Sequence, residues 1–211
     1  MDVFPVSLDL YQRPCLVVGG GNVATRKVLS LLNAGAKVTV VSPEITAELQ
    51  ELHSDQLIRW ENHPYRRGEV VGYWLVVCAV NSQDIQRAVF LDCERARIWV
   101  NSVDELNHSS FIFPATVKKG PITLSINTNG NSPFFAAWLA NTLGQYITQE
   151  HITVLETLSS LRSKLKEKGY STQSLNWASL FNTDLFAAAK KGKDQLNQII
   201  NSWLADSGLK L

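Results

Sequence analysis

Residues 14–41 read PCLVVGGGNVATRKVLSLLNAGAKVTVV, and they hold the strongest structural pattern in the chain. A short apolar run ends at three glycines, which is typical of a buried parallel strand. Apolar and small side chains then recur at helical spacing over 22–34, and Gly35 is a candidate C-terminal cap. A second apolar run over 37–41 stops at Ser42. The order strand, glycine loop, helix, strand predicts a βαβ unit of a parallel sheet.

The glycine loop, GGGNVA at 19–24, matches the pattern G-x-G-x-x-G/A of dinucleotide-binding proteins. Gly19 permits the tight turn, Gly21 lets the backbone approach a pyrophosphate, and Ala24 lets the helix pack closely on the strand. Backbone N–H groups of the first helical turn would then hold the anion. The alternative is a glycine-rich turn that only joins a strand to a helix; the flanking strand and helix favour the nucleotide site. The predicted phosphate-binding residues are Gly19, Gly21, Asn22, Val23 and Ala24.

Alternating strand and helix patterns continue to about residue 110, and the second half then changes character. The whole pattern predicts an α/β fold with a doubly wound, parallel Rossmann-type sheet, followed by a strand, a helix opened by Ser132-Pro133, and a helical C-terminal region. The expected domains are 1–113, 114–147 and 148–211. The expected strands are 14–18, 37–41, 57–60, 74–80, 98–103 and 121–127, and the expected helices are 22–34, 45–53, 85–96, 133–147, one from 150 onward, and one or two after 170.

Composition excludes several function classes. The net charge is +1 and no basic stripe is present, which argues against binding to nucleic acid. No apolar run approaches the ~20 residues that cross a bilayer, and the first residues lack the basic start of a signal peptide. Cys15, Cys78 and Cys93 are far apart in apolar stretches, and His53, His63 and His151 are dispersed. We therefore expect a soluble cytoplasmic protein with no membrane partner, no disulfide and no protein-held metal.

The residues after the second strand bear on the choice of nicotinamide cofactor. An acidic residue usually binds the ribose hydroxyls at this position, whereas this chain has Ser42-Pro43-Glu44. Ser42 can hydrogen-bond a 2′-hydroxyl, and Glu44 can assist. No Arg or Lys lies between Lys37 and Arg59 to receive a 2′-phosphate. The sequence therefore favours NAD over NADP.

Three blocks resemble, in order, the precorrin-2 dehydrogenases, a family that includes the N-terminal half of siroheme synthases. They are FPVSLDLYQRPCLVVGGGNVATRKVLSLLNAGAKVTVVSPE at 4–44, VNSVDELNHSSFIFPATV at 100–117 and PITLSINTNGNSPFFAAWLANTL at 121–143. The resemblance implies a Rossmann domain, a small dimerisation region at 114–147 that forms a homodimer, and a helical C-terminal region. It also implies NAD-dependent oxidation of precorrin-2 to sirohydrochlorin, and some members insert Fe²⁺ as well. Over 176–190 the family's basic-aromatic pattern is missing, so iron insertion stays open.

The same resemblance identifies Asp104 as the family's essential aspartate. Independently, Asp104 follows the strand expected at 98–103, at the end of a parallel sheet where ligands bind. A carboxylate there could take a proton as hydride leaves, or accept pyrrole protons as a metal enters. A helix or turn cap is the alternative. By resemblance, cofactor contacts also come from the strand ends at Ala79, Val80, Asn101 and Val103.

Precorrin-2 carries several acetate and propionate groups, so its cleft should offer donors and cations. The loop 127–133 leads into a helix N-terminus that could hold a carboxylate, although a plain capped turn is an equal alternative. For any single cationic side chain, the alternative to substrate binding is an ordinary solvated position on the surface. The candidate substrate-binding residues are Lys118, His108, Ser110, Thr128, Asn129 and Gly130.

A non-catalytic nucleotide-sensing Rossmann module is the competing function. Such a sensor needs the glycine loop, but it has no need of Asp104 followed by the SFIFP block at 110–114. The residues beyond the glycine loop therefore favour an enzyme.

Overall fold

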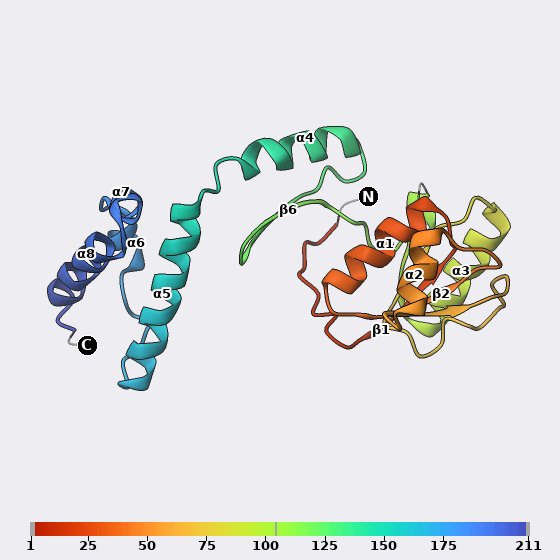
Figure 1. Ribbon diagram of the computed structural model, residues 1–211, viewed down its shortest axis with the longest axis horizontal. Coiled ribbons are helices and arrows are strands. Elements are labelled where there is room, and N and C mark those ends of the chain that lie inside the picture. The colour runs from red at the N-terminus through yellow and green to blue at the C-terminus, as the bar shows by residue number, and fades with distance from the viewer. Residues whose placement is uncertain (1–2, 104, 210–211) are drawn as a thin grey trace. The chain divides into compact units, whose positions relative to one another are not determined.

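The computed structural model of the protein describes residues 3–103 and 105–209, so the prediction for Asp104 lies outside the described residues. The chain divides into two compact units (Figure 1). The first, here called the Rossmann unit, comprises Met1–Phe113 together with Asn129–Asn131. The second, here called the C-terminal unit, comprises Pro114–Thr128 and Ser132–Leu211.

The Rossmann unit is built on a parallel sheet whose strand order is β3-β2-β1-β4-β5. Val18 pairs with Val41 on one side and with Cys78 on the other. Cys78 in turn pairs with Ser102. The carboxyl ends of the strands therefore lie in register along one edge, where parallel sheets bind ligands. The strands are β1 (Pro14–Val18), β2 (Lys37–Val41), β3 (Ile58–Glu61), β4 (Leu75–Cys78) and β5 (Trp99–Ser102).

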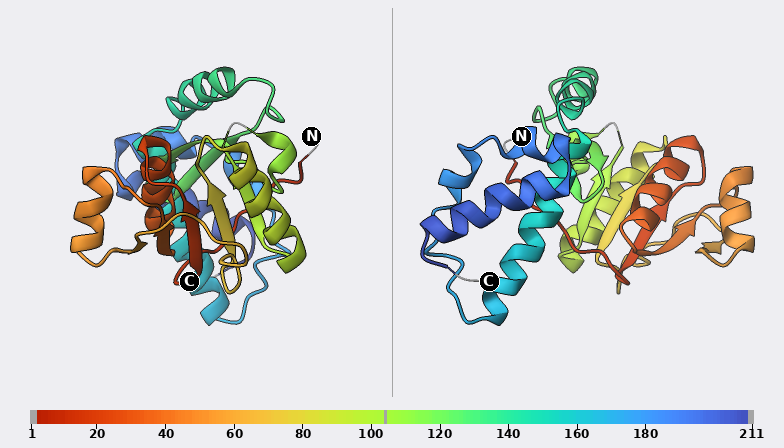
Figure 2. Two further views of the ribbon diagram at one scale, coloured as in Figure 1. Left: turned by 90° about the vertical axis from the view of Figure 1, so that its right-hand side faces the viewer. Right: turned by 60° about the vertical axis from the view of Figure 1, so that its left-hand side comes forward.

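Helices cover both faces of this sheet, which confirms the predicted doubly wound fold. Cys15 and Val17 of β1 share a buried cluster with Val28 of the helix that follows the glycine loop. Leu16 and Val18 point to the opposite face, because side chains alternate along a strand, and there they pack with buried residues of α3. Figure 2 (left view) shows α1 and α3 on opposite sides of the strands. The helices are α1 (Asn22–Asn33), α2 (Ala47–Ser54) and α3 (Gln83–Ala96).

The three cysteines are free and buried, as the sequence predicted. Burial raises the pKa of the Cys15 thiol to about 11 and the pKa of Cys78 and of Cys93 to about 12. They are therefore protonated near neutral pH and act as small apolar side chains of the core.

The C-terminal unit begins with an antiparallel hairpin of β6 (Ala115–Lys119) and β7 (Ile122–Ile126). The strand predicted at 121–127 is β7, whereas β6 was not predicted. The two strands turn at Gly120, whose φ of 54° is in the left-handed region. The Gly-Pro pair at 120–121, between two alternating runs, was the available signal for a hairpin.

Helix α4 (Pro133–Gly144) begins as predicted, because the Ser132 Oγ accepts the Phe135 N–H at 3.2 Å and Pro133 occupies the first turn. Three helices follow the long α5, where one or two were expected. Their buried leucines, with Leu161 and Leu165 of α5, form a separate core. No helix in the described parts of the chain is both long and apolar enough to cross a membrane. These helices are α5 (Gln149–Glu167), α6 (Trp177–Phe181), α7 (Leu185–Lys191) and α8 (Lys193–Asp206).

Candidate active site

The glycine loop is tightly packed on its inner side and open on its outer side. A Cβ on Gly19 would collide with the carbonyl of Ala79, and one on Gly20 would collide with the carbonyl of Glu44. Gly19 also has a φ of 117°, which disfavours any side chain there. Gly21 differs, because it is exposed and a Cβ on it would meet nothing within 4 Å. The loop therefore has the shape that a phosphate group requires.

The N-terminus of α1 offers donors to that open side. Gly21 is the N-cap residue and, in the described structure, supplies no side-chain cap to the first turn. The Thr25 hydroxyl hydrogen-bonds the Gly21 carbonyl at 3.1 Å and the Thr46 hydroxyl at 2.8 Å, which fixes the loop against the segment after β2. Helix N-terminal N–H groups of this kind, together with the helix dipole, attract an anion. The loop residues thus fit a dinucleotide pyrophosphate.

Ser42 lies at the end of β2, but its hydroxyl is engaged within the protein. The side chain is buried, and its Oγ donates to the carbonyl of Glu44 at 2.6 Å. The Ser42 carbonyl accepts the indole N–H of Trp60 at 2.9 Å. In this conformation Ser42 can accept a hydrogen bond from a ribose hydroxyl but has no free proton to donate. Pro43 and Glu44 are exposed beside it.

The ends of β4 and β5 continue the sheet edge beyond the strands. The Ala79 N–H donates to the backbone carbonyl of Val18 at 2.8 Å, and the Val103 N–H donates to the backbone carbonyl of Cys78 at 2.9 Å. Val80 is half-buried, and its carbonyl accepts the amide of Gln86 at 2.7 Å. The second of these contacts holds the backbone of Val103, the residue that precedes Asp104 in the sequence.

Two predicted site residues link β5 to the segment that follows it. The Ser110 Oγ accepts the Val100 N–H at 2.8 Å, and the Asn101 amide donates to the carbonyl of Phe111 at 3.0 Å. The Oγ of neighbouring Ser109 likewise accepts the Ser102 N–H at 2.9 Å. Asn101 and Ser110 therefore hold the 109–111 segment against β5, a structural task that the sequence did not reveal.

His108 retains an unused nitrogen near the sheet edge. It closes the short 3₁₀ helix η1 (Leu106–His108), and its ring packs on Phe90 with centroids 5.4 Å apart. Its Nδ1 is buried and has no hydrogen-bond partner among the described residues. Because a buried polar atom usually has a partner, His108 is a candidate to contact a bound molecule.

The structure brings part of the predicted substrate loop to this region. Asn129 has a φ of 52°, in the left-handed region that asparagine tolerates, and Gly130 has a φ of 80°. A Cβ on Gly130 would lie 2.6 Å from a methyl group of Leu106, so this loop packs closely on η1 within the Rossmann unit. Thr128 belongs to the C-terminal unit, where its hydroxyl accepts the Ser132 N–H at 3.2 Å. Lys118 is exposed on β6 of that same unit.

The chain is similar to several known proteins. Residues 6–115 match the model of a family described as putative NAD(P)-binding. Siroheme synthase 3 of Aeromonas hydrophila is 34% identical over 210 residues, which cover 98% of this chain and 45% of that protein. The siroheme synthase of Zymomonas mobilis is 35% identical over 189 residues, which cover 89% of this chain and 40% of that protein. The chain thus spans less than half the length of these curated relatives.

A solved structure named "SirC, precorrin-2 dehydrogenase" superposes with a TM-score of 0.74 at 22% identity, covering 95% of this chain and 98% of that one. At this identity the likeness shows the fold. Together with the siroheme synthases, it confirms the resemblance that the three sequence blocks indicated.

Proposed function

The chain belongs to the NAD(P)-binding family whose model it matches, and from that premise we propose that it is an NAD-dependent precorrin-2 dehydrogenase. The reaction would convert precorrin-2 to sirohydrochlorin. The observation that carries the proposal is the open glycine loop at the N-terminus of α1, in a chain whose relatives are named siroheme synthases. The glycine loop fits a nicotinamide dinucleotide, which supplies the hydride acceptor when bound.

The protein's own part in this reaction is to position the reactants and to move a proton. The glycine loop and the strand ends at Ala79, Val80 and Val103 would hold the dinucleotide at the sheet edge. Asp104 would take the proton released as hydride leaves the substrate. His108 and the 129–130 loop, which packs on η1, would contact the substrate's carboxylates.

The deciding experiment is incubation of the purified chain with precorrin-2 and NAD. Formation of NADH, together with the absorption spectrum of sirohydrochlorin, would support the dehydrogenase. Binding of NAD without any product would instead favour the competing nucleotide-sensing module.

We expect kcat/KM to be at least about tenfold higher with NAD than with NADP. The reason is that a 2′-phosphate would lack a cation partner, and a hydrogen bond to a charged group contributes roughly 1.5–3 kcal/mol. No Arg or Lys occurs between Lys37 and Arg59, and Arg59 pairs with Glu61 at 3.1 Å. Steady-state kinetics with both cofactors measure the ratio. Equal or higher efficiency with NADP would reject the assignment.

We propose that the hairpin and α4, within 114–147, form the dimerisation region between a Rossmann domain at 1–113 and a helical region at 148–211. Large apolar side chains of α4 and its C-terminal end are exposed in the single chain: Phe134 by 88%, Trp138 by 59% and Tyr146 by 72%. The helix packs against the hairpin, where Gly144 contacts Val117. Several large apolar side chains exposed on one short stretch of chain support the proposal of an interface there.

The wild-type chain should therefore be a homodimer in light scattering at micromolar concentration, and Trp138→Asp should shift it to the monomer. The carboxylate would have to be buried at the interface without a partner, which is strongly unfavourable. Val71→Asp is the matched control, because Val71 is 72% exposed on the Rossmann unit and should leave the dimer intact. A monomeric wild type would contradict the proposal; α4 would then dock within its own chain.

Fe²⁺ is proposed as a second substrate at the same site. The macrocycle nitrogens themselves become the metal's ligands, and a base such as Asp104 is needed to accept the pyrrole protons.

We also propose a reducing, cytoplasmic location for the protein, which its buried free thiols support.

A further inference from the structure

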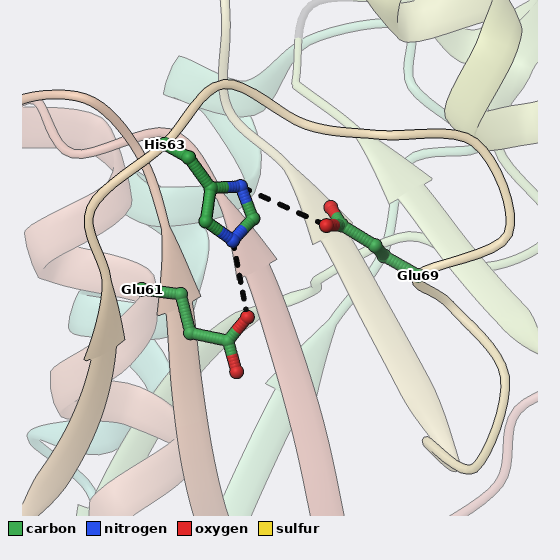
Figure 3. Close-up of side chains that lie close together, drawn as sticks. All are labelled: Glu61, His63 and Glu69. Carbon is green, nitrogen blue, oxygen red and sulfur yellow. Dashed lines mark hydrogen bonds and ion pairs between the residues drawn. The ribbon is translucent and has the colours of Figure 1, made fainter.

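Three potential metal ligands meet at the end of β3, although the sequence alone presented His63 as an isolated histidine. Glu61 is the last residue of β3, and His63 and Glu69 lie on the segment that follows it. One ligand atom from each lies within 4.8 Å of the others. The side chains are only 21–26% exposed. Figure 3 shows the imidazole of His63 between the two carboxylates.

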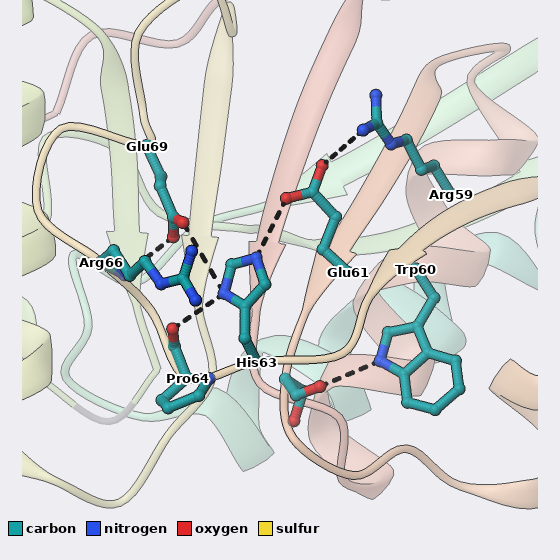
Figure 4. A network of polar contacts seen from close by, with 8 residues as sticks. Arg59, Trp60, Glu61, His63, Pro64, Arg66 and Glu69 are labelled. Atoms are coloured by element: carbon teal, nitrogen blue, oxygen red, sulfur yellow. Dashed lines mark hydrogen bonds and ion pairs between the residues drawn. The ribbon is translucent and has the colours of Figure 1, made fainter.

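The hydrogen bonds of His63 define which ring nitrogen can bind a cation. Its Nδ1 lies 3.0 Å from the backbone carbonyl of Pro64 (Figure 4). A carbonyl only accepts hydrogen bonds, so Nδ1 carries the proton in this contact. The Nε2 then presents a lone pair, and it faces the Oε2 of Glu61 at 3.3 Å. Two acceptors at this distance require a cation or a second proton between them. A backbone carbonyl that holds the other ring nitrogen is also the usual arrangement for a metal-binding histidine.

Each of the two carboxylates is held through one of its oxygens, and its other oxygen faces His63. The Glu61 Oε1 pairs with Arg59 at 3.1 Å, and the Glu69 Oε2 accepts the backbone N–H of Arg66 at 2.8 Å. The Glu69 Oε1 is 3.7 Å from the Nδ1 of His63. Two ligands on a tetrahedral ion with bonds of about 2.1 Å are about 3.4 Å apart, which the 3.3 Å between Nε2 and Oε2 matches. The Glu69 Oε1 lies on the Nδ1 side of the ring, so the flexible Glu69 side chain has to move toward Nε2 to complete the set.

The segment between β3 and β4 is anchored independently of any ion. Asp92 on α3 is buried, and its Oδ2 accepts the hydroxyl of Tyr65 at 2.8 Å and the N–H of Gly68 at 3.0 Å. The backbone between His63 and Glu69 is therefore tied to the Rossmann core. Such anchoring lowers the entropy cost of bringing the ligands together.

We propose that Glu61, His63 and Glu69 form a binding site for one first-row divalent transition-metal ion such as Zn²⁺. Two carboxylates and a neutral imidazole balance the charge of such an ion and leave a coordination position for water. The imidazole favours zinc, cobalt, nickel or iron over magnesium and calcium, which prefer oxygen ligands. The alternative to a metal ion is a second proton on His63, whose ring would then form ion pairs with Glu61 and Glu69.

The test is calorimetric titration of the EDTA-treated full chain with Zn²⁺ alone, repeated with Co²⁺ to follow its visible absorption. We expect saturable binding of one ion per chain. His63→Gln and Glu61→Gln should each weaken it at least about tenfold, as losses around metal sites do. His53→Gln is the matched control, because His53 lies in the same unit, packs on Trp60 and contacts the Ile58 carbonyl. The buried thiols should not compete, because burial raises their pKa to between about 11 and about 12.

Two results would overturn the site. One is the absence of saturable Zn²⁺ binding below millimolar concentration, with ¹⁵N spectra showing a doubly protonated His63 at neutral pH. The other is binding that both variants leave unchanged, because the ion would then lie elsewhere. Far-ultraviolet circular dichroism of each variant verifies that the fold is retained.

Discussion

Asp104→Asn is expected to lower the rate of precorrin-2 oxidation by about 10²–10⁴-fold, the usual contribution of a general base. Asparagine is nearly isosteric with aspartate, but it lacks both the charge and the basic oxygen. The melting temperature and the Kd for NAD should therefore stay at their wild-type values. The measurements are single-turnover formation of NADH, calorimetry with NAD and a thermal melt.

Glu105→Gln is the control, because it removes a carboxylate at the next position. The Glu105 Oε1 accepts the Asn107 N–H at 3.2 Å, and a glutamine oxygen can accept the same bond. This control should oxidise precorrin-2 at close to the wild-type rate. If Asp104→Asn also turned over at that rate, Asp104 would be no more than a cap.

Siroheme formation from sirohydrochlorin and Fe²⁺, corrected for the rate without enzyme, gives a second readout with Asp104→Ala. We expect weak insertion that the substitution removes, since the same base would accept the pyrrole protons. Robust insertion that survives the substitution would place this chemistry at another site, and none above background would leave a dedicated dehydrogenase.

The sequence predicted the Rossmann sheet well because buried parallel strands are continuous apolar runs that stop at glycine or polar residues. β6 was not predicted because Val117 is its only large apolar residue, between Thr116 and Lys118, which face solvent, whereas β7 has three large apolar residues in alternation. The helices after 170 were undercounted because α6 spans only 5 residues and α7 only 7, too short to show a helical period.

The candidate site was predictable where it is local in sequence and not where it depends on strand order. The glycine loop is a contiguous motif, so its residues and its place at the N-terminus of α1 followed directly. The structural roles of Asn101 and Ser110 did not follow from the sequence, because they depend on the strand order, which places β5 at the edge of the sheet. The cluster of Glu61, His63 and Glu69 likewise depends on the course of the chain after β3, which no spacing in the sequence encodes.

Two alanine substitutions one residue apart should separate stability from cofactor binding in the glycine loop. In Gly20→Ala, the new Cβ would collide with the Glu44 carbonyl and crowd Ile45 and Ser42. We expect the free energy of unfolding to fall by about 1–3 kcal/mol, as overpacked cores do. The adjacent Gly21→Ala should leave it unchanged, because Gly21 has a φ of −84° and a Cβ there meets nothing within 4 Å.

Gly21→Ala should nevertheless weaken NAD binding by roughly tenfold to a hundredfold. The added methyl group would occupy the space that the pyrophosphate needs, and one lost hydrogen bond to a charged group corresponds to roughly 1.5–3 kcal/mol. Denaturant unfolding without cofactor and calorimetry with NAD measure the two effects separately. Asn33→Ala, at the exposed far end of α1, is the control and should change neither quantity. Wild-type affinity in Gly21→Ala would show that the phosphates are held elsewhere, since the loop would then only join β1 to α1.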